Sequence, residues 1–267
     1  MTTISLNIEK KWEVSGVSMP ESILSIPDHD WLYVSNVNKQ ETGYISRISK
    51  DGVIDDLKWI EGIATPTGMG FLNGKIYVAD QSQVHVIELE SAKIIKTLSS
   101  AAKTLNDISI SKDGRVFVSD ISTGSIYTVQ DDSVVLWTKS AEFPFPNGVL
   151  VQNNDLIVGD MGTALSRSLT ADQYGSLYKV NLSDKSVQLI KSTNKIGSID
   201  GIVAFNDGLI ITTVVGKLFY VTEDKQVLLG SAEGGIADLG IDAEKQMIYV
   251  PFLFANKVVA YHLSSEL

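Results

Sequence analysis

The feature that most constrains the fold is a sequence pattern that recurs six times along the 267 residues. Each copy has a polar or small residue, a short apolar strand, a turn rich in Asp, Asn or Gly, and a second strand. The copies read PESILSIPDHDWLYVSN, TPTGMGFLNGKIYVAD, TLNDISISKDGRVFVSD, FPNGVLVQNNDLIVGD, SIDGIVAFNDGLIITT and GIADLGIDAEKQMIYVPF. A repeat of this kind predicts one supersecondary unit per copy, stacked against its neighbours.

We call the polar or small residue near the start of each copy its corner residue. The corner residues are Glu21, Thr67, Asn106, Asn147, Asp200 and Ala237, at intervals of 46, 39, 41, 53 and 37 residues. This spacing suits one four-stranded sheet per copy, because further alternating apolar sequence follows each of the first five copies. We therefore predict an all-β fold, a six-bladed β-propeller with four-stranded antiparallel blades, in which residues 1–267 form a single domain. The N-terminal segment ISLNIEKKWEV is expected to close the last blade.

Charge and composition restrict the partners. The formal net charge of −10 argues against a nucleic acid or an anionic membrane surface as a partner. The chain has no cysteine, which excludes disulfides, thiolate metal sites and a cysteine nucleophile. No apolar run reaches membrane-spanning length and no signal peptide is recognised. We expect a cytoplasmic protein, or a periplasmic one if a leader was trimmed, that is a monomer or a small homo-oligomer.

The corner residues share one position in the repeat, so a propeller would bring them together around its central channel. Two of them are carboxylates and two are carboxamides, and oxygen donors of this kind suit Ca²⁺, Mg²⁺ or Mn²⁺. The alternative is that Asn-Asp, Asn-Gly and Asp-Gly are ordinary turn dipeptides. Because the four residues occupy the same position in their repeats, a shared cation site is favoured over four independent turns.

The motifs around these residues resemble those of the SMP-30/gluconolactonase/LRE-like six-bladed propellers and, more distantly, of the paraoxonases. They are PES at 20–22, LND at 105–107 followed by DG at 113–114, PNGV at 146–149 and DGI at 200–202. The resemblance implies that Glu21, Asn147 and Asp200 hold one divalent cation, expected to be Ca²⁺, with Mg²⁺ or Zn²⁺ as alternatives. It implies that Asn106 binds substrate or is a further metal ligand, and that the chain hydrolyses a small-molecule lactone or related ester.

Two departures from the family pattern bear on the substrate. Ser22 and Ile23 follow Glu21, whereas family members often have Gly-Pro there. Members that act on sugar lactones carry an arginine where this chain has Thr104. The resemblance therefore does not specify a polyhydroxylated sugar lactone as the substrate.

A mechanism follows from these expectations as a hypothesis. The cation would polarise the ester carbonyl and lower the pKa of bound water. Asp200 is the expected general base, because a carboxylate that touches both the cation and the water is placed to accept the proton. Asn106 would orient the substrate oxygen.

Further candidates lie at the ends of the second strands. Asp80, Asp120 and Asp160 end these strands in three successive copies, where they either surround the mouth of the site or cap turns by accepting backbone N–H groups. Asp120 is the candidate among them for substrate binding. The longest interval contains the segment 161–176, expected to be a loop over the channel, and Arg167 within it is a second candidate for substrate binding. A surface insertion without function is the alternative for that loop.

Three other functions stay open. A non-catalytic binding propeller of the NHL type would need no metal at the corners, and a strictosidine-synthase-like propeller would rely on a channel Glu without the metal set. A family member that keeps the cation only for structure is the third. His29, His85 and His262 are out of phase with the corner residues, so a histidine-based dyad is disfavoured.

Overall fold

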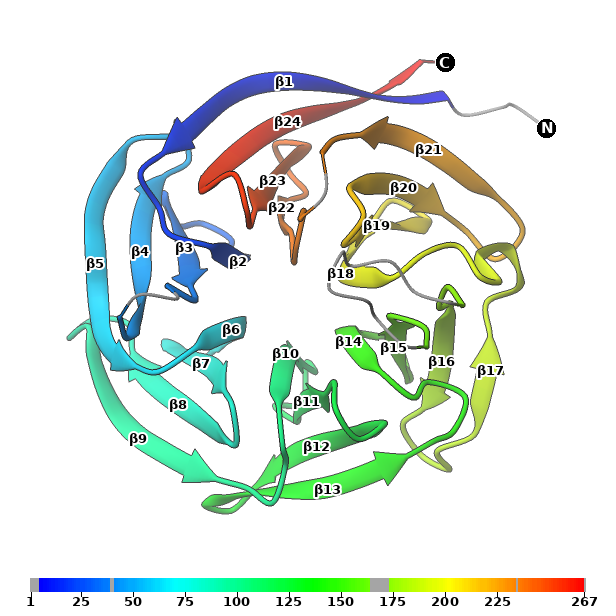
Figure 1. Ribbon diagram of the computed structural model, residues 1–267, viewed down its shortest axis with the longest axis horizontal. Helices are drawn as coiled ribbons and strands as arrows, with labels where there is room; N and C mark the ends of the chain where they lie inside the picture. The colour runs from blue at the N-terminus through cyan, green and yellow to red at the C-terminus, as the bar shows by residue number, and fades with distance from the viewer. Residues whose placement is uncertain (1–4, 39–40, 164–172, 234, 267) are drawn as a thin grey trace.

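The computed structural model describes residues 5–38, 41–163, 173–233 and 235–266. They form six four-stranded antiparallel sheets arranged as blades around a central axis, which confirms the predicted six-bladed propeller (Figure 1). The innermost strands are β2 (Pro20–Ser25), β6 (Pro66–Leu72), β10 (Leu105–Ile110), β14 (Pro146–Gln152), β18 (Ile199–Phe205) and β22 (Gly240–Asp242). The second strands are β3 (Trp31–Asn36), β7 (Lys75–Asp80), β11 (Val116–Asp120), β15 (Asp155–Asp160), β19 (Gly208–Thr213) and β23 (Met247–Phe252).

The outermost strand is the most exposed strand of each blade. The third strands are β4 (Gly43–Ser49), β8 (Gln83–Glu88), β12 (Ser125–Gln130), β16 (Leu177–Asn181), β20 (Lys217–Val221) and β24 (Lys257–Glu266). The outermost strands are β5 (Ile54–Ile63), β9 (Lys93–Ser99), β13 (Ser133–Lys139), β17 (Val187–Leu189), β21 (Gln226–Ser231) and β1 (Ser5–Ser15). One short 3₁₀ helix, Lys191–Thr193, follows β17. In the part of the chain that the structure describes, no helix is long and apolar enough to cross a membrane.

The two ends of the chain meet in the sixth blade, whose strand order is β1-β24-β23-β22. β1 pairs antiparallel with β24 from Ser5 opposite Glu266 to Ser15 opposite Lys257. The N-terminal segment therefore closes the ring, as predicted. Closure in this way fixes the first and last blades side by side, and with them the corner residues at opposite ends of the sequence.

The apolar core is divided among the blade interfaces. The described residues form six clusters of buried apolar side chains, and each cluster joins two neighbouring blades. Each repeat buries one face against the blade before it and the other against the blade after it, which explains why both faces of the second strands are apolar. This packing fixes the inner strands, and therefore the side chains that face the axis.

Candidate metal site

Five of the six corner residues lie inside the inner strands and not in turns, which corrects one sequence interpretation; Ala237 lies three residues before β22. In the first five blades the pairing between inner and second strand slips at the corner, as between Pro146 and Val149 of β14. Each slip is a β-bulge that contains the corner residue and the residue after it. Bulges re-aim side chains next to functional sites, and here they allow two consecutive residues to leave the regular ladder near the axis.

Close contact between neighbouring blades explains the glycine in Asn147-Gly148. A Cβ atom added to Gly148 would lie 2.0 Å from the carbonyl oxygen of Asp200 in the next blade. Gly201 meets Asp238 of the sixth blade in the same way, at 2.7 Å from its Cα atom. Glycine is required here because two backbones meet, and this contact brings the strands of Asn147 and Asp200 together.

Three of the predicted ligands carry a buried oxygen that has no hydrogen-bond partner. In the described residues, four buried side-chain polar atoms lack a partner: Glu21 Oε2, Asn147 Oδ1, Asp200 Oδ1 and Ser198 Oγ. The first three side chains are 8%, 3% and 6% exposed. A buried polar atom without a partner is costly, and a cation bound by these three oxygens would remove that cost.

Neighbouring side chains orient two of these ligands. Asn106 Nδ2 donates to Glu21 Oε1 at 3.4 Å, so one Glu21 oxygen is held while the other is free. Asn106 therefore supports Glu21 in this structure, and direct ligation by Asn106 stays a prediction. Asn147 Nδ2 donates to the sulfur of Met161 at 3.2 Å, which leaves the amide oxygen without a partner.

Two further buried carboxylates follow the corner residues and were not recognised as part of the site. Asp107 in β10 accepts the N–H of Val149 in the next blade at 2.7 Å and the N–H of Ile108 at 2.7 Å. Asp238 accepts the hydroxyl of Ser22 in the first blade. Each carboxylate thus connects its own blade with a neighbour directly beside a predicted ligand. The sequence contained both residues within the quoted motifs, but their inter-blade partners depend on the folded ring.

The four carboxylates raise one another's affinity for protons. Burial, followed by the charges of Asp200, Asp238 and Asp107, raises the pKa of Glu21 well above its ordinary value. Burial and then the charge of Asp238 raise the pKa of Asp200 and of Asp107 as well. Burial raises the pKa of Asp238 to about 7. These groups therefore resist carrying negative charge together unless a cation is present.

The donor set fits a divalent cation in its chemistry. Among the described residues, no ion pair links these carboxylates to Lys or Arg. Within the same residues, no group of three His, Cys, Asp or Glu side chains is placed to hold a metal ion. The predicted set differs from such a group, because it has two carboxylates and one amide oxygen. Ca²⁺ accepts such mixed oxygen donors together with water.

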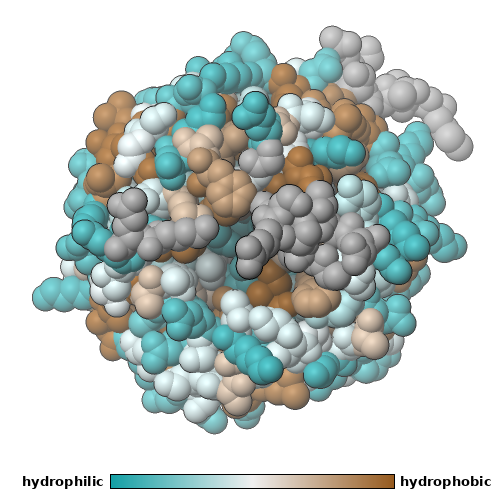
Figure 2. Space-filling view, viewed as in Figure 1, coloured by the Kyte–Doolittle hydropathy of each residue, from teal (hydrophilic) through white to brown (hydrophobic). Residues whose placement is uncertain are grey.

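The second residue after each corner residue is apolar, and these six side chains form a ring around the axis. Its members are all buried: Ile23, Met69, Ile108, Val149, Ile202 and Leu239. All six line a central cavity of about 180 Å³, and each belongs to a different one of the six core clusters. Figure 2, viewed along the axis, shows one face of the propeller, hollowed near its centre with hydrophilic surface inside the hollow. The ring explains why the neighbouring carboxylates are poorly solvated.

The aspartates at the ends of the second strands hold the chain segments that lead into the inner strands. Asp80 accepts the N–H groups of Ala64 and Thr65, and Asp160 accepts those of Phe145 and Gly162. Asp120 accepts four hydrogen bonds, from the N–H groups of Lys103, Thr104 and Ser122 and the hydroxyl of Thr123. Its side chain is 0% exposed, so it presents no surface to a substrate. The geometry favours the turn-capping interpretation for Asp120 over substrate binding.

Replacing Asp120 with Ala is expected to lower the free energy of unfolding by about 2 to 4 kcal/mol, because three partly buried backbone N–H groups and one hydroxyl lose their acceptor. Equilibrium urea denaturation would measure this change. Asp132→Ala is the matched control, since the Asp132 side chain is 75% exposed and only pairs with Lys96 at the surface. Equal unfolding free energies for the two variants would contradict the positioning role of Asp120.

The remaining candidates lie outside this cluster. Arg167 falls outside the described residues, so its predicted contact with substrate stays a prediction. His85 is buried in the second blade between Asp80 and Thr97, with both ring nitrogens at 3.0 Å from its partners. His29 and His262 lie in the first and sixth blades and are not corner residues.

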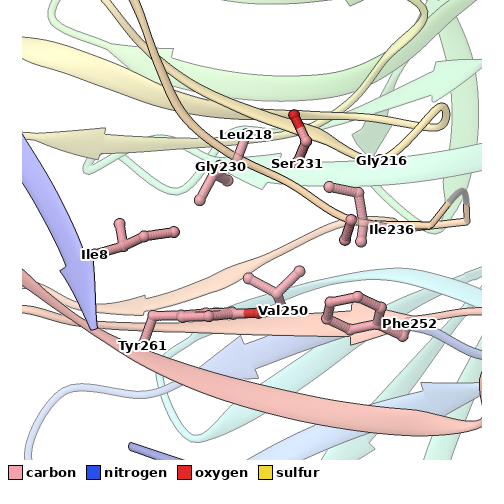
Figure 3. Close-up of a pocket in the computed structure, with 10 residues that line it drawn as sticks. Ile8, Gly216, Leu218, Gly230, Ser231, Ile236, Val250, Phe252 and Tyr261 are labelled. Carbon is pink, nitrogen blue, oxygen red and sulfur yellow. The ribbon is translucent and has the colours of Figure 1, made fainter. Parts of the chain in front are cut away.

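A second cavity lies at the interface of the fifth and sixth blades (Figure 3). It has a volume of about 140 Å³, and its lining is mainly apolar, with Ile8, Leu218, Val250 and Phe252 around it. None of its described lining residues is a carboxylate or a histidine. It therefore lacks the groups that acid–base or metal chemistry requires.

Comparison with known proteins supports the architecture. No protein-family profile matches the sequence, and no curated protein matches it. The fold is similar to the crystal structure of a catalytically inactive histidine-to-alanine variant of virginiamycin B lyase from Staphylococcus aureus with quinupristin. The TM-score is 0.64 at 13% sequence identity, over 97% of this chain and 99% of the lyase chain. At this identity the likeness extends to the propeller fold and not to the chemistry.

Proposed function

We propose that this chain is a divalent-metal-dependent hydrolase of the SMP-30/gluconolactonase type that acts on a small-molecule lactone or related ester. The observation that carries the proposal is the set of buried oxygens without partners on Glu21, Asn147 and Asp200. These are the residues that the resemblance assigns to the metal. Ca²⁺ is the proposed cation, with Mg²⁺ and Zn²⁺ as alternatives.

The residues of the chain would share the catalytic work as follows. A divalent cation at this site would act as a Lewis acid toward the ester carbonyl and lower the pKa of a nearby water. Asp200 would accept the proton of the attacking water, since a carboxylate that lies beside both the cation and the water is placed to take it. Asn106 would hold Glu21 with one N–H and donate the other to a substrate oxygen.

The corner residues of this chain differ in kind from a histidine-based catalytic site. The neighbour's variant with one histidine replaced by alanine is described as catalytically inactive. In this chain the corner residues of the six repeats include no histidine, and His85 is buried between structural partners. The oxygen-rich site favours hydrolysis assisted by a metal over a histidine-dependent elimination.

The experiment that tests the proposal is a hydrolysis assay with aliphatic lactones and simple aryl esters, before and after removal of metal with EDTA and dialysis. Hydrolysis is expected to fall to background after chelation and to return when Ca²⁺, Mg²⁺ or Zn²⁺ is added. Hydrolysis that is unchanged by chelation would contradict the proposal. Cation binding without hydrolysis of any tested ester would favour a structural cation, and absence of both would favour an NHL-like binding propeller.

A further inference from the structure

The carboxamide of Asn147 contacts the thioether of Met161. Asn147 Nδ2 lies 3.2 Å from Met161 Sδ, and the two side chains are 3% and 4% exposed. A thioether sulfur can accept a hydrogen bond but cannot donate one, so it pairs with the amide nitrogen and not with the amide oxygen. This contact therefore selects one of the two orientations of the amide, the one that leaves Oδ1 without a partner.

Met161 is itself held firmly against the strand that carries Asn147. Its N–H donates to the carbonyl oxygen of Phe145 at 3.0 Å, two residues before Asn147. Asp160 accepts the N–H groups of Phe145 at 2.8 Å and of Gly162 at 2.9 Å. Asp160 and Met161 are therefore both bonded to Phe145, directly before β14, and Gly162 is bonded to Asp160, so the backbone around Met161 is held close to the strand of Asn147.

The same segment also contacts the chain that leads to Asp200. Thr163 pairs with Gln173 across the base of the insertion at 161–176, and the N–H of Gly175 donates to the carbonyl oxygen of Gly197 at 2.9 Å. Gly197 lies three residues before Asp200. The described base of this insertion is thus bonded to the segments of two predicted ligands.

We propose that Met161 is a positioning residue that holds the Asn147 carboxamide with its oxygen free to bind the cation. This inference rests on the proposed function, because it requires Asn147 to be a metal ligand. Without the sulfur, the amide loses the contact that distinguishes its two ends, and part of the population presents the NH₂ group to the cation. Such molecules bind the cation poorly, because an amide NH₂ is a donor only.

The test is a double-mutant cycle on the full chain, with Ca²⁺ alone as the probe and isothermal titration calorimetry as the readout. Met161→Leu keeps nearly the same volume but removes the acceptor, so Ca²⁺ affinity is expected to fall roughly threefold to tenfold. In the Asn147→Asp protein both terminal atoms of the side chain are oxygens, so either orientation presents an oxygen to the cation. Met161→Leu is therefore expected to leave the Ca²⁺ affinity of the Asn147→Asp protein unchanged.

Two controls separate positioning from packing. Met161→Gln supplies an amide oxygen as acceptor and is expected to keep Ca²⁺ affinity within about twofold of the wild type. Thermal unfolding without Ca²⁺ checks that the variants fold. Two results would overturn the role of Met161 but not the proposed function. In one, Met161→Leu leaves the Ca²⁺ affinity of the otherwise wild-type protein unchanged; in the other, it lowers the Ca²⁺ affinity of the Asn147→Asp protein by the same factor. A wild-type protein that binds no divalent cation would overturn both this inference and the proposed function.

Discussion

Replacing Asp200 with Ala is expected to weaken Ca²⁺ binding by roughly a hundredfold or more and to reduce ester hydrolysis to background. The variant removes one of the two carboxylates in the predicted ligand set and also the proposed general base. Asp200 Oδ1 has no partner within the described protein, so its deletion breaks no hydrogen bond made by that atom. The expected loss is therefore specific to cation binding and catalysis.

The isosteric variant Asp200→Asn adds a second readout. Burial and the charge of Asp238 raise the pKa of Asp200, so ionising it costs free energy in the metal-free protein. Removing that charge is expected to raise the thermal unfolding temperature of the metal-free protein at about pH 8 while Ca²⁺ binding is lost. A gain in stability together with a loss of binding is the pattern expected of a residue retained for function.

The matched control for both variants is Asp224→Ala. Asp224 belongs to the same blade as Asp200, in the exposed turn between β20 and β21. It should retain wild-type Ca²⁺ affinity and hydrolysis. If Asp200→Ala also retained both, Asp200 would be neither a ligand nor the base, and the proposed site would be wrong.

The arrangement of the blades in a ring could be predicted from the sequence, and so could the position of the corner residues at the same height along its axis. Both follow from the fact that the corner residues occupy the same position in every repeat. Equivalent positions of a propeller lie at equivalent places around its axis, so Glu21, Asn147 and Asp200 could be grouped without knowing any contact. The closing role of the N-terminal strand was predictable for a similar reason, since the last repeat lacked its fourth strand.

Contacts between blades could not be predicted in the same way. The Asn147-Gly148 dipeptide has the sequence of an ordinary turn, whereas its glycine is required by the backbone of Asp200, 52 residues further along the chain. The buried partners of Asp107, Asp238 and Met161 likewise depend on which strands meet across a blade interface. A small residue or an aspartate directly after the corner in every repeat was the available signal, but a single repeat does not reveal its cause.

The second large effect expected is a pH-dependent stability that the cation reverses. The pKa values of Glu21, Asp107, Asp200 and Asp238 are raised in the folded protein, that of Asp238 to about 7. The folded state therefore binds more protons than the unfolded state above about pH 4, where free carboxyl groups ionise. Stability contributed by these groups is fully present below that pH and is lost as the pH rises through the raised folded values. The metal-free protein is thus expected to unfold at a lower temperature at about pH 8 than at about pH 5.

A divalent cation should oppose this loss, because it binds the ionised carboxylates of the folded state only. At a hundredfold excess over Kd, a ligand of this kind adds about 2.7 kcal/mol, which corresponds to roughly 5 to 10 °C in unfolding temperature. We expect that increase with Ca²⁺ at about pH 8 and a much smaller one at about pH 5, where protons compete with the cation. Scanning calorimetry at both pH values would measure it, with Glu21→Gln/Asp200→Asn as the variant that should lose the Ca²⁺ effect and Asp224→Asn as the one that should keep it. A Ca²⁺ effect of the same size in all three proteins would place the cation elsewhere, and metal-free stability that does not fall between the two pH values would contradict the buried-carboxylate argument.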